Sequence, residues 1–318
     1  MFRTVAESGE SALMSVHGTS ANDVWLVGAD HGAGPLVLHW DGAAWQRPET
    51  GANGDMWWVH ALPNGVVHMA GARGLLLVYR DGVFDQQAAP SAEGLGKRAE
   101  PIVFGVWAAS EGDVYAVGSV EGSGGFLWHS DGQIWQAVPL PDLPVDGDGR
   151  RAGLFKVWGV SAEDVWLVGE SGVVLRGNAA AGFARVESGT DERLFTVHAA
   201  GDRLAIVGGT ANGWGLELQR SELVANTPPG AGPLQGVNIS EDGAIWAAGL
   251  GGNVFHREAP EADWQNVITG VPVQSLHAVW VDPDGGVWTV GGRVLTLDLD
   301  RGVALHRSLP SAAVPAAF

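Results

Sequence analysis

Short apolar strands separated by polar turns recur along the whole chain, and one phrase marks the centre of each repeat. The phrase is an aliphatic residue, an aromatic residue, two small or aliphatic residues and a glycine. Clear copies occupy residues 24–28, 114–118, 165–169, 245–249 and 287–291, and weaker copies occupy 67–71 and 204–208. Repetition at roughly 40 to 50 residues, with no helical period inside the repeat, predicts a β-propeller of four-stranded blades.

Each repeat reads as four strands, named A to D in chain order. Strand A ends in a valine followed by His, Trp or Asn, strand B carries the phrase, and strand C alternates as a half-buried strand does. A turn such as Asp41-Gly42 leads to strand D, which begins with an aromatic residue. The residue after the valine of strand A forms a column: His17, His60, Trp107, Trp158, His198, Asn238 and Trp280. Seven regularly spaced positions predict seven blades.

The two ends of the chain bear on how the ring closes. Residues 2–9 resemble the D strand at 183–189, so we expect the N-terminus to supply the outer strand of the last blade. That pairing would leave no sheet edge open. Residues 303–306 are an alternative for the same strand, which would leave one segment surplus. The prediction is therefore an all-β, seven-bladed β-propeller that forms a single domain over residues 1–318.

The repeat also resembles a known group of propellers. Residues 157–169 and 39–45 follow the series V-W-G-x-S-x-x-D-V-W-x-V-G … H-x-D-G-x-x-W. This series resembles the Asp-box-related Trp-Gly repeat β-propellers, which include photosystem II assembly factor-like proteins and propeller proteins of myxobacteria. The resemblance covers nearly the whole chain. In that group the Asp-Gly element is a C-to-D turn, so the resemblance implies a fold and no particular activity.

Charge and composition restrict the classes of partner and the kinds of site that the chain can have. The 18 basic and 36 acidic residues give a net charge of −18, which disfavours nucleic acid because phosphate backbones are bound by basic groups. No apolar run reaches the roughly 18 residues of a membrane span, and Met1 is not followed by a signal segment. The chain has no cysteine, which excludes disulfides and thiolate metal sites. The acidic, Trp-Gly-rich character slightly favours a bacterial envelope or secreted location over the cytoplasm.

The repeat separates structural tryptophans from candidate binding residues. Most of the fifteen tryptophans fall in the A, B, C or D columns and are expected to pack within or between blades. Trp57, Trp58 and Trp214 lie outside these columns. By propeller topology, the starts of the A strands share a face with the B–C and D–A connections. We therefore expect these three indoles on one surface, as anchors for a ligand or partner.

Loop length points to the same face. The B–C segments at 29–34, which contains His31, and at 119–124 are longer than their counterpart at 170–172. The D–A connections from 88 to 101 and from 139 to 153 are also expanded. Insertions concentrated on one side of a repeat ring usually mark its binding side, although tolerated drift is the alternative.

A second column, three residues before the first, is predicted to surround the mouth of the central channel. It is mostly aromatic or apolar, with two polar members: Met14, Trp57, Phe104, Phe155, Phe195, Gln235 and His277. An apolar pocket with a few convergent polar groups is the usual form of a binding site.

The histidines suggest a different kind of site. His17, His60 and His198 share one level, and His277 comes from the blade next to that of His17. His17, His60 and His277, with or without His198, would hold a transition metal such as copper, iron, zinc or manganese. The alternative is that each histidine replaces an inter-blade indole and is hydrogen-bonded to the next blade.

Other motifs give weaker indications of function. Residues 142–151 contain closely spaced carboxylates that would suit calcium, but the acidic pattern of an EF-hand loop is missing, so a solvated turn is favoured. No Gly-x-Ser-x-Gly element occurs. The third-strand residues His39, His129 and His256, aligned with Tyr79, Arg176 and Gln219, predict a polar sheet face.

Two functions remain open. The first is a propeller that binds a protein or small-molecule ligand through the long-loop face and the aromatic channel mouth. The second is a metalloenzyme with a histidine-bound transition metal in the channel.

Overall fold

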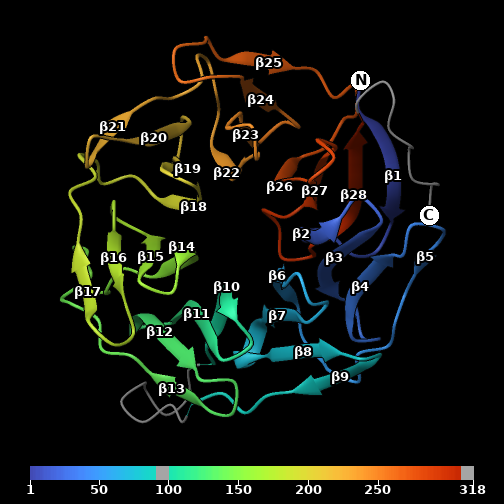
Figure 1. Cartoon of the computed structure of the whole chain (residues 1–318), viewed down its shortest axis with the longest axis horizontal. Helices are drawn as coiled ribbons and strands as arrows, with labels where there is room; N and C mark the ends of the chain where they lie inside the picture. Colours follow the sequence, from blue (N-terminus) through green and yellow to red (C-terminus); the bar gives the residue numbers. More distant parts are fainter. Residues whose placement is uncertain (91–99, 309–318) are drawn as a thin grey trace.

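The computed structural model describes residues 1–90 and 100–308, which form seven four-stranded antiparallel sheets around a central axis (Figure 1). Each sheet is one blade, and in six of the seven blades the strands follow in chain order from the axis outward. The single helical element in the part of the chain that the structure describes is a short 3-10 turn, η1 (Ala72–Gly74). The predicted all-β, seven-bladed propeller is confirmed.

The inner half of each blade consists of two strands, and the second of them carries the repeated apolar phrase. The innermost strands, which face the axis, are β2 (Leu13–Ser20), β6 (Met56–Ala61), β10 (Ile102–Ser110), β14 (Leu154–Ser161), β18 (Leu194–Ala200), β22 (Leu234–Ile239) and β26 (Ser275–Val281). The second strands are β3 (Asp23–Asp30), β7 (Val67–Gly71), β11 (Asp113–Val120), β15 (Asp164–Gly169), β19 (Arg203–Gly208), β23 (Ile245–Gly249) and β27 (Val287–Arg293).

The outer half of each blade is shorter and more exposed. The third strands are β4 (Pro35–Trp40), β8 (Leu76–Arg80), β12 (Gly124–Ser130), β16 (Val174–Asn178), β20 (Trp214–Gln219), β24 (Val254–Arg257) and β28 (Asp300–Arg307). The outermost strands are β5 (Trp45–Gln46), β9 (Val83–Gln86), β13 (Trp135–Ala137), β17 (Gly182–Arg185), β21 (Glu222–Ala225), β25 (Gln265–Val267) and β1 (Arg3–Ser8).

The ring closes through the N-terminus. Strand β1 pairs with β28, from Arg3 opposite His306 to Ser8 opposite Gly302, and becomes the outer strand of blade 7. Both segments that competed for this position in the sequence are therefore used, because β28 is the third strand of the same blade. The first and last strands of the chain lie side by side (Figure 1), and the pairing covers the outer edge of β28.

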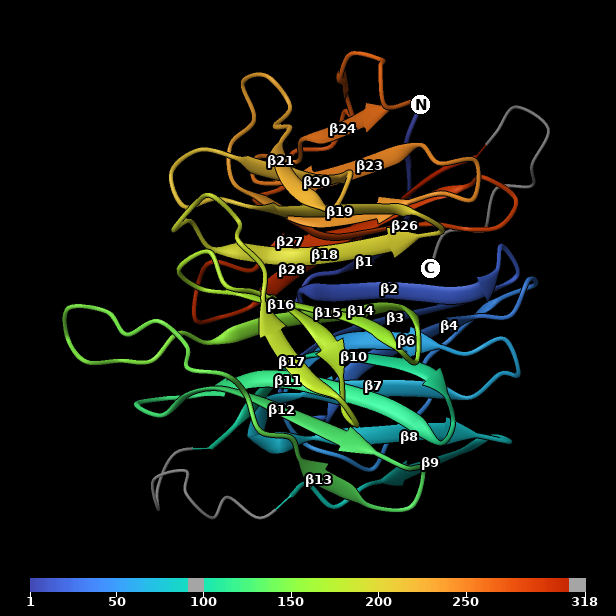
Figure 2. The same cartoon turned by 60° about the vertical axis from the view of Figure 1, so that its left-hand side comes forward.

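The connections sort onto two faces. The A–B and C–D turns lie at one end of the blades, here called the AB face. The B–C and D–A connections lie at the other end, here called the BC face. Figure 2 shows the long connection between β13 and β14 projecting from the BC face.

One module of a carboxylate, an aromatic ring and a third-strand basic residue recurs within several blades near the AB face. In blade 1, the Asp23 carboxylate lies 2.7 Å from His39 Nε2, and the His39 ring stacks on Trp25 with 3.9 Å between ring centroids. Trp25 Nε1 donates to the same aspartate. The third-strand histidines His39, His129 and His256 are thus packed against aromatic rings and do not form the simple polar face that the sequence predicts.

No helix of the kind that spans a membrane, long and apolar, is found within residues 1–90 and 100–308.

Candidate functional site at the BC face

Every inner strand carries a β-bulge at the same place. In β2 the register with β3 passes from Leu13 opposite Gly28 to Ser15 opposite Val27, so Met14 is the extra residue. A bulge bends its strand and re-aims a side chain. The same shift singles out one residue in each other inner strand: Trp57, Phe104, Phe155, Phe195, Gln235 and His277. The bulge residues are the seven positions that the sequence predicted around the channel mouth.

Four of these bulge residues form a continuous row of rings across blades 2 to 5. The ring centroids are 5.4 Å apart for Trp57 and Phe104, 5.7 Å for Phe104 and Phe155, and 5.3 Å for Phe155 and Phe195. These spacings are those of favourable aromatic pairs. All four rings are half-buried. We call Trp57, Phe104, Phe155 and Phe195 the aromatic row.

The other three bulge residues complete the circle differently. His277 lies 6.0 Å from the Trp57 ring, and its Nδ1 lies 2.6 Å from the carbonyl oxygen of the buried Met14, to which it donates. Burial, and then the nearby Lys156, lower the pKa of His277 to about 4, so this imidazole is neutral at pH 7. Gln235 is buried, and its side-chain oxygen accepts a hydrogen bond from Ser275.

Lys156 is the charged residue beneath this circle, and the sequence interpretation missed it. Only 3% of Lys156 is exposed. Its Nζ donates to the Phe104 carbonyl at 2.9 Å and lies 3.4 Å above the Trp58 ring, which is a cation–π contact. A Cβ at Gly105 would lie 3.2 Å from Lys156 Cδ, so the glycine leaves room for the lysine to cross blade 3.

No carboxylate forms an ion pair with Lys156 among the residues that the structure describes. Burial therefore lowers the pKa of its amine well below the usual value. A signal for Lys156 was present in the sequence, because it is the single Lys, Arg, Asp or Glu within the seven inner strands. A charged side chain in such a position is costly unless it has a use.

The predicted histidine set is divided between two levels. His17 and His60 are 4.8 Å apart near the AB face, and His198 packs on Trp158 at 4.2 Å. His277 lies with Trp57 at the level of the bulges, three residues or about 10 Å away along a strand. Within the described ranges no group of three or more His, Asp or Glu is placed to hold a metal ion.

The AB-level histidines bond to neighbouring blades instead. The Ala61 N–H donates to His17 Nδ1 and the Ile239 N–H donates to His198 Nδ1, each at 3.1 Å. His60 Nε2 lies 3.3 Å from the Ala108 carbonyl. Burial lowers the pKa of His17 to about 4 and that of His198 to about 3. This is the arrangement expected of histidines that replace inter-blade indoles.

The three unassigned tryptophans all begin strands at the BC end, but they differ in exposure. Trp57 is half-buried in the aromatic row, and Trp214 is half-buried at the start of β20, against a core cluster that includes Trp166. Trp58 is buried, with 7% exposed, under Lys156. Trp58 is therefore a core residue and not a surface anchor. None of the three indole N–H groups has a hydrogen-bond partner among the described residues.

The expanded loops of blades 3 and 4 border a cavity of about 640 Å³ on the BC face. Its lining includes residues 119–122 of one loop, Arg150 and Arg151 of the other, and Glu170. Residues 142–151, which the sequence analysis considered for calcium, belong to this second loop. There Asp146 accepts backbone hydrogen bonds from Asp148 and Arg150, which makes it a turn residue, and those bonds, that from Arg150 first, lower its pKa.

His31 is exposed on the B–C loop of blade 1, with Nε2 3.4 Å from the Leu299 carbonyl. Asp30 organises that loop by accepting hydrogen bonds from the Gly32 and Gly54 N–H groups. Of the expanded connection from 88 to 101, residues 91–99 lie outside the described residues.

Comparison with solved structures supports the architecture over nearly the whole chain. YCF48 from Cyanidioschyzon merolae has a TM-score of 0.70 at 16% identity, covering 98% of this chain and 99% of that one. YCF48 bound to a D1 peptide gives 0.67 at 14% identity, with 97% and 94% covered. Virginiamycin B lyase from Staphylococcus aureus gives 0.70 at 13% identity, with 96% and 100% covered.

No protein-family model matches the chain, and no curated protein matches its sequence. At such low identities the likeness establishes the fold alone. The chain is a seven-bladed β-propeller of the same architecture as these proteins.

Proposed function

We propose that this propeller binds a segment of a partner protein, or a small ligand, on the BC face at the aromatic row. The observation that carries the proposal is the bulge repeated in all seven inner strands, which offers one side chain per blade around the channel mouth. Trp57, Phe104, Phe155 and Phe195 fill four adjacent positions of that circle with half-exposed rings. Rigid aromatic groups give large contact area at small entropic cost.

Lys156 adds chemical character to this surface. Its amine lies beneath the row and donates to the Phe104 carbonyl, without a carboxylate partner among the described residues. A ligand with an apolar part for the row and a hydrogen-bond acceptor for Lys156 fits this arrangement best. The longer loops at 119–124 and 138–153 would flank it.

The comparisons support a protein ligand in particular. YCF48, which shares the fold, has been solved with a D1 peptide bound. Membership of the Asp-box-related Trp-Gly repeat propellers is part of the same proposal, because the spacing of the repeats supports it.

A peptide selection tests the proposal. Peptides selected from a random library on the wild-type protein should bind the double variant Phe104→Ala, Phe155→Ala at least tenfold more weakly. The matched control is Phe84→Ala, because Phe84 is also half-buried but lies on the outer strand β9. The control should leave peptide binding unchanged. Selected peptides that bind the double variant as tightly as the wild type would contradict the proposal.

A further inference from the structure

One interface between blades lacks the large side chains that fill the others. In five blades the second strand carries an aromatic ring that packs against a third-strand His or Arg: Trp25 with His39, Tyr115 with His129, Trp166 with Arg176, Trp246 with His256 and Trp288 with His306. In blade 5 the third-strand position is filled by Glu217, which forms a buried ion pair with Arg257 of blade 6. Blade 2 has neither arrangement.

Blade 2 places smaller side chains at these positions. The register pairs His68 with Val78, so Val78 occupies the position that His39 has in blade 1. The repeat pattern of the sequence instead aligns Tyr79 with His39, which is one residue out of register. On the facing blade, Ser130 takes the place that Tyr79 occupies against Trp25 in the preceding interface. An indole, an imidazole and a phenol are thus replaced by an imidazole, a valine and a serine.

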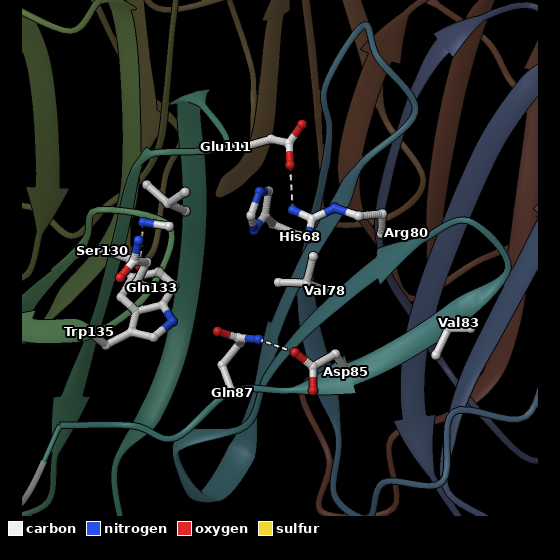
Figure 3. Close-up of a pocket in the computed structure, with 12 residues that line it drawn as sticks. His68, Val78, Arg80, Val83, Asp85, Gln87, Glu111, Ser130, Gln133 and Trp135 are labelled. Atoms are coloured by element: carbon white, nitrogen blue, oxygen red, sulfur yellow. Dashed lines mark hydrogen bonds and ion pairs between the residues drawn. The ribbon is translucent and has the colours of Figure 1, made fainter.

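The result is a cavity of about 390 Å³ between blades 2 and 3, lined by His68, Val78 and Ser130. Figure 3 shows His68 beside the ion pair of Arg80 and Glu111, with Trp135 across the cavity. The volume lies within the roughly 300–1,000 Å³ typical of ligand sites.

His68 gives the cavity its chemistry. The residue is 5% exposed, and its Nε2 is buried without a hydrogen-bond partner in the described part of the chain. Burial, followed by the nearby Arg80, lowers its pKa to about 4, so the imidazole is neutral at pH 7 and offers one site for a complementary partner. Arg80 and Glu111 form an ion pair at the rim, and the Asp85 carboxylate, which also lines the cavity, accepts a hydrogen bond from Gln87 and disfavours an anionic ligand.

We propose that this cavity binds an indole-type ring, a planar uncharged heterocycle with one N–H, in the space that larger side chains fill at the equivalent positions of the preceding interface. The ring would lie edge-on to His68, in the space that Val78 and Ser130 leave open, and its N–H would donate to His68 Nε2. Trp135 would close the other side. This site is separate from the aromatic row and does not depend on the function proposed above.

Titration with indole and with N-acetyltryptophanamide, followed by calorimetry, tests the proposal. Wild-type protein should bind one equivalent of at least one of these probes. Binding of N-acetyltryptophanamide identifies a tryptophan side chain of a partner as the source, and binding of indole alone identifies a free small molecule. The N-methylated form of whichever probe binds, which lacks the N–H, should bind about fivefold more weakly because one hydrogen bond is lost.

Two variants fill the cavity from opposite walls. His68→Trp restores the indole of the repeat, and Ser130→Tyr restores the phenol that Tyr79 supplies in the preceding interface. Each should abolish binding, so either one suffices if the other does not fold. Ser161→Tyr, at an exposed turn away from the cavity, is the matched control and should bind normally, as should Phe104→Ala, Phe155→Ala. Absence of saturable binding to the wild type, or binding that survives both filling variants, would overturn the proposal.

Discussion

At the scale of single residues, the column that contains His198 and Asn238 shows that two different side chains can make the same hydrogen bond to the next blade. The Ile239 N–H donates to His198 Nδ1, and the Val281 N–H donates in the same way to Asn238 Oδ1 in the next blade. His198 is buried, and its pKa is lowered to about 3. Asparagine and histidine thus make the same contact, but only histidine titrates.

This equivalence predicts a change in acid stability. Because the folded-state pKa of His198 lies below the unfolded value of 6.5, only the unfolded chain takes up this proton as the pH falls from 6.5 toward 3. Each such histidine therefore lowers the free energy of unfolding by up to about 1.4 kcal/mol per pH unit in that window, and the full stability is present above it. In urea unfolding at pH 7 and 4.5, His198→Asn should lose about 2 kcal/mol less than the wild type.

The exposed His31→Asn is the control for this measurement and should follow the wild-type pH profile. Equal acid losses in His198→Asn and in the wild type would show that His198 is not held neutral.

Lys156 supports a second prediction at this scale. Lys156→Met keeps the length of the side chain and removes a buried amine that has no carboxylate partner among the described residues. We expect the free energy of unfolding to rise by about 1 kcal/mol or more, and binding at the aromatic row to weaken. Denaturant unfolding and peptide binding measure the two effects. A variant that is less stable and binds normally would show that Lys156 is structural.

The residue-scale site was predictable in part. The sequence identified the circle from Met14 to His277, because each member lies three residues before a regular column. It did not identify Lys156, because the path of that side chain to Trp58 depends on Gly105 in the intervening blade. It also placed Trp58 on the surface, because Trp58 falls outside the repeat columns and its contact with Lys156 is not visible in the sequence.

At the scale of elements, the β-bulge is the feature that lets each inner strand turn two residues three positions apart toward the axis. A regular strand alternates its side chains, so residues three apart cannot both face the axis. The extra residue in each inner strand removes this restriction. His17 and Met14 in β2, or Trp158 and Phe155 in β14, can therefore line the same channel at two levels.

This interpretation predicts unequal effects of two single-residue deletions in β14. Deletion of Phe155 removes only the extra residue, so Leu154 and Lys156 keep their partners Gly169 and Val168. Deletion of Val157 shifts the residues beyond it by one position and turns their side chains to the opposite face. We expect the first variant to lose about 2–4 kcal/mol and remain folded, and the second to lose its tertiary structure. Near-ultraviolet circular dichroism and thermal unfolding distinguish them, and equal damage would refute the bulge interpretation.

At the scale of the whole molecule, the ring depends on one pairing between segments nearly 300 residues apart. Strand β1 covers β28, with Val5 and Ala6 buried against blade 7. Without it, β28 would present an open edge, which is a template for association between molecules.

Deletion of residues 1–8 should therefore lower the thermal midpoint and produce oligomers at micromolar concentration. A synthetic peptide of residues 1–9 should restore the monomer and the midpoint when added in excess, because it can refill the edge. Size-exclusion chromatography and thermal unfolding measure both effects. A deletion variant that is monomeric and as stable as the full chain would show that this strand is dispensable.

The sequence by itself determined the seven-bladed ring, the strand order within each blade, and the circle of residues at the channel mouth. These follow from local pattern, because alternation, turn residues and repetition act over a few neighbouring positions. Tertiary structure alone decided the burial of Trp58, the exposure of the aromatic row, and the cavity beside His68. Each of these depends on the size of side chains that face one another from different blades, and no pattern within a single repeat records that size.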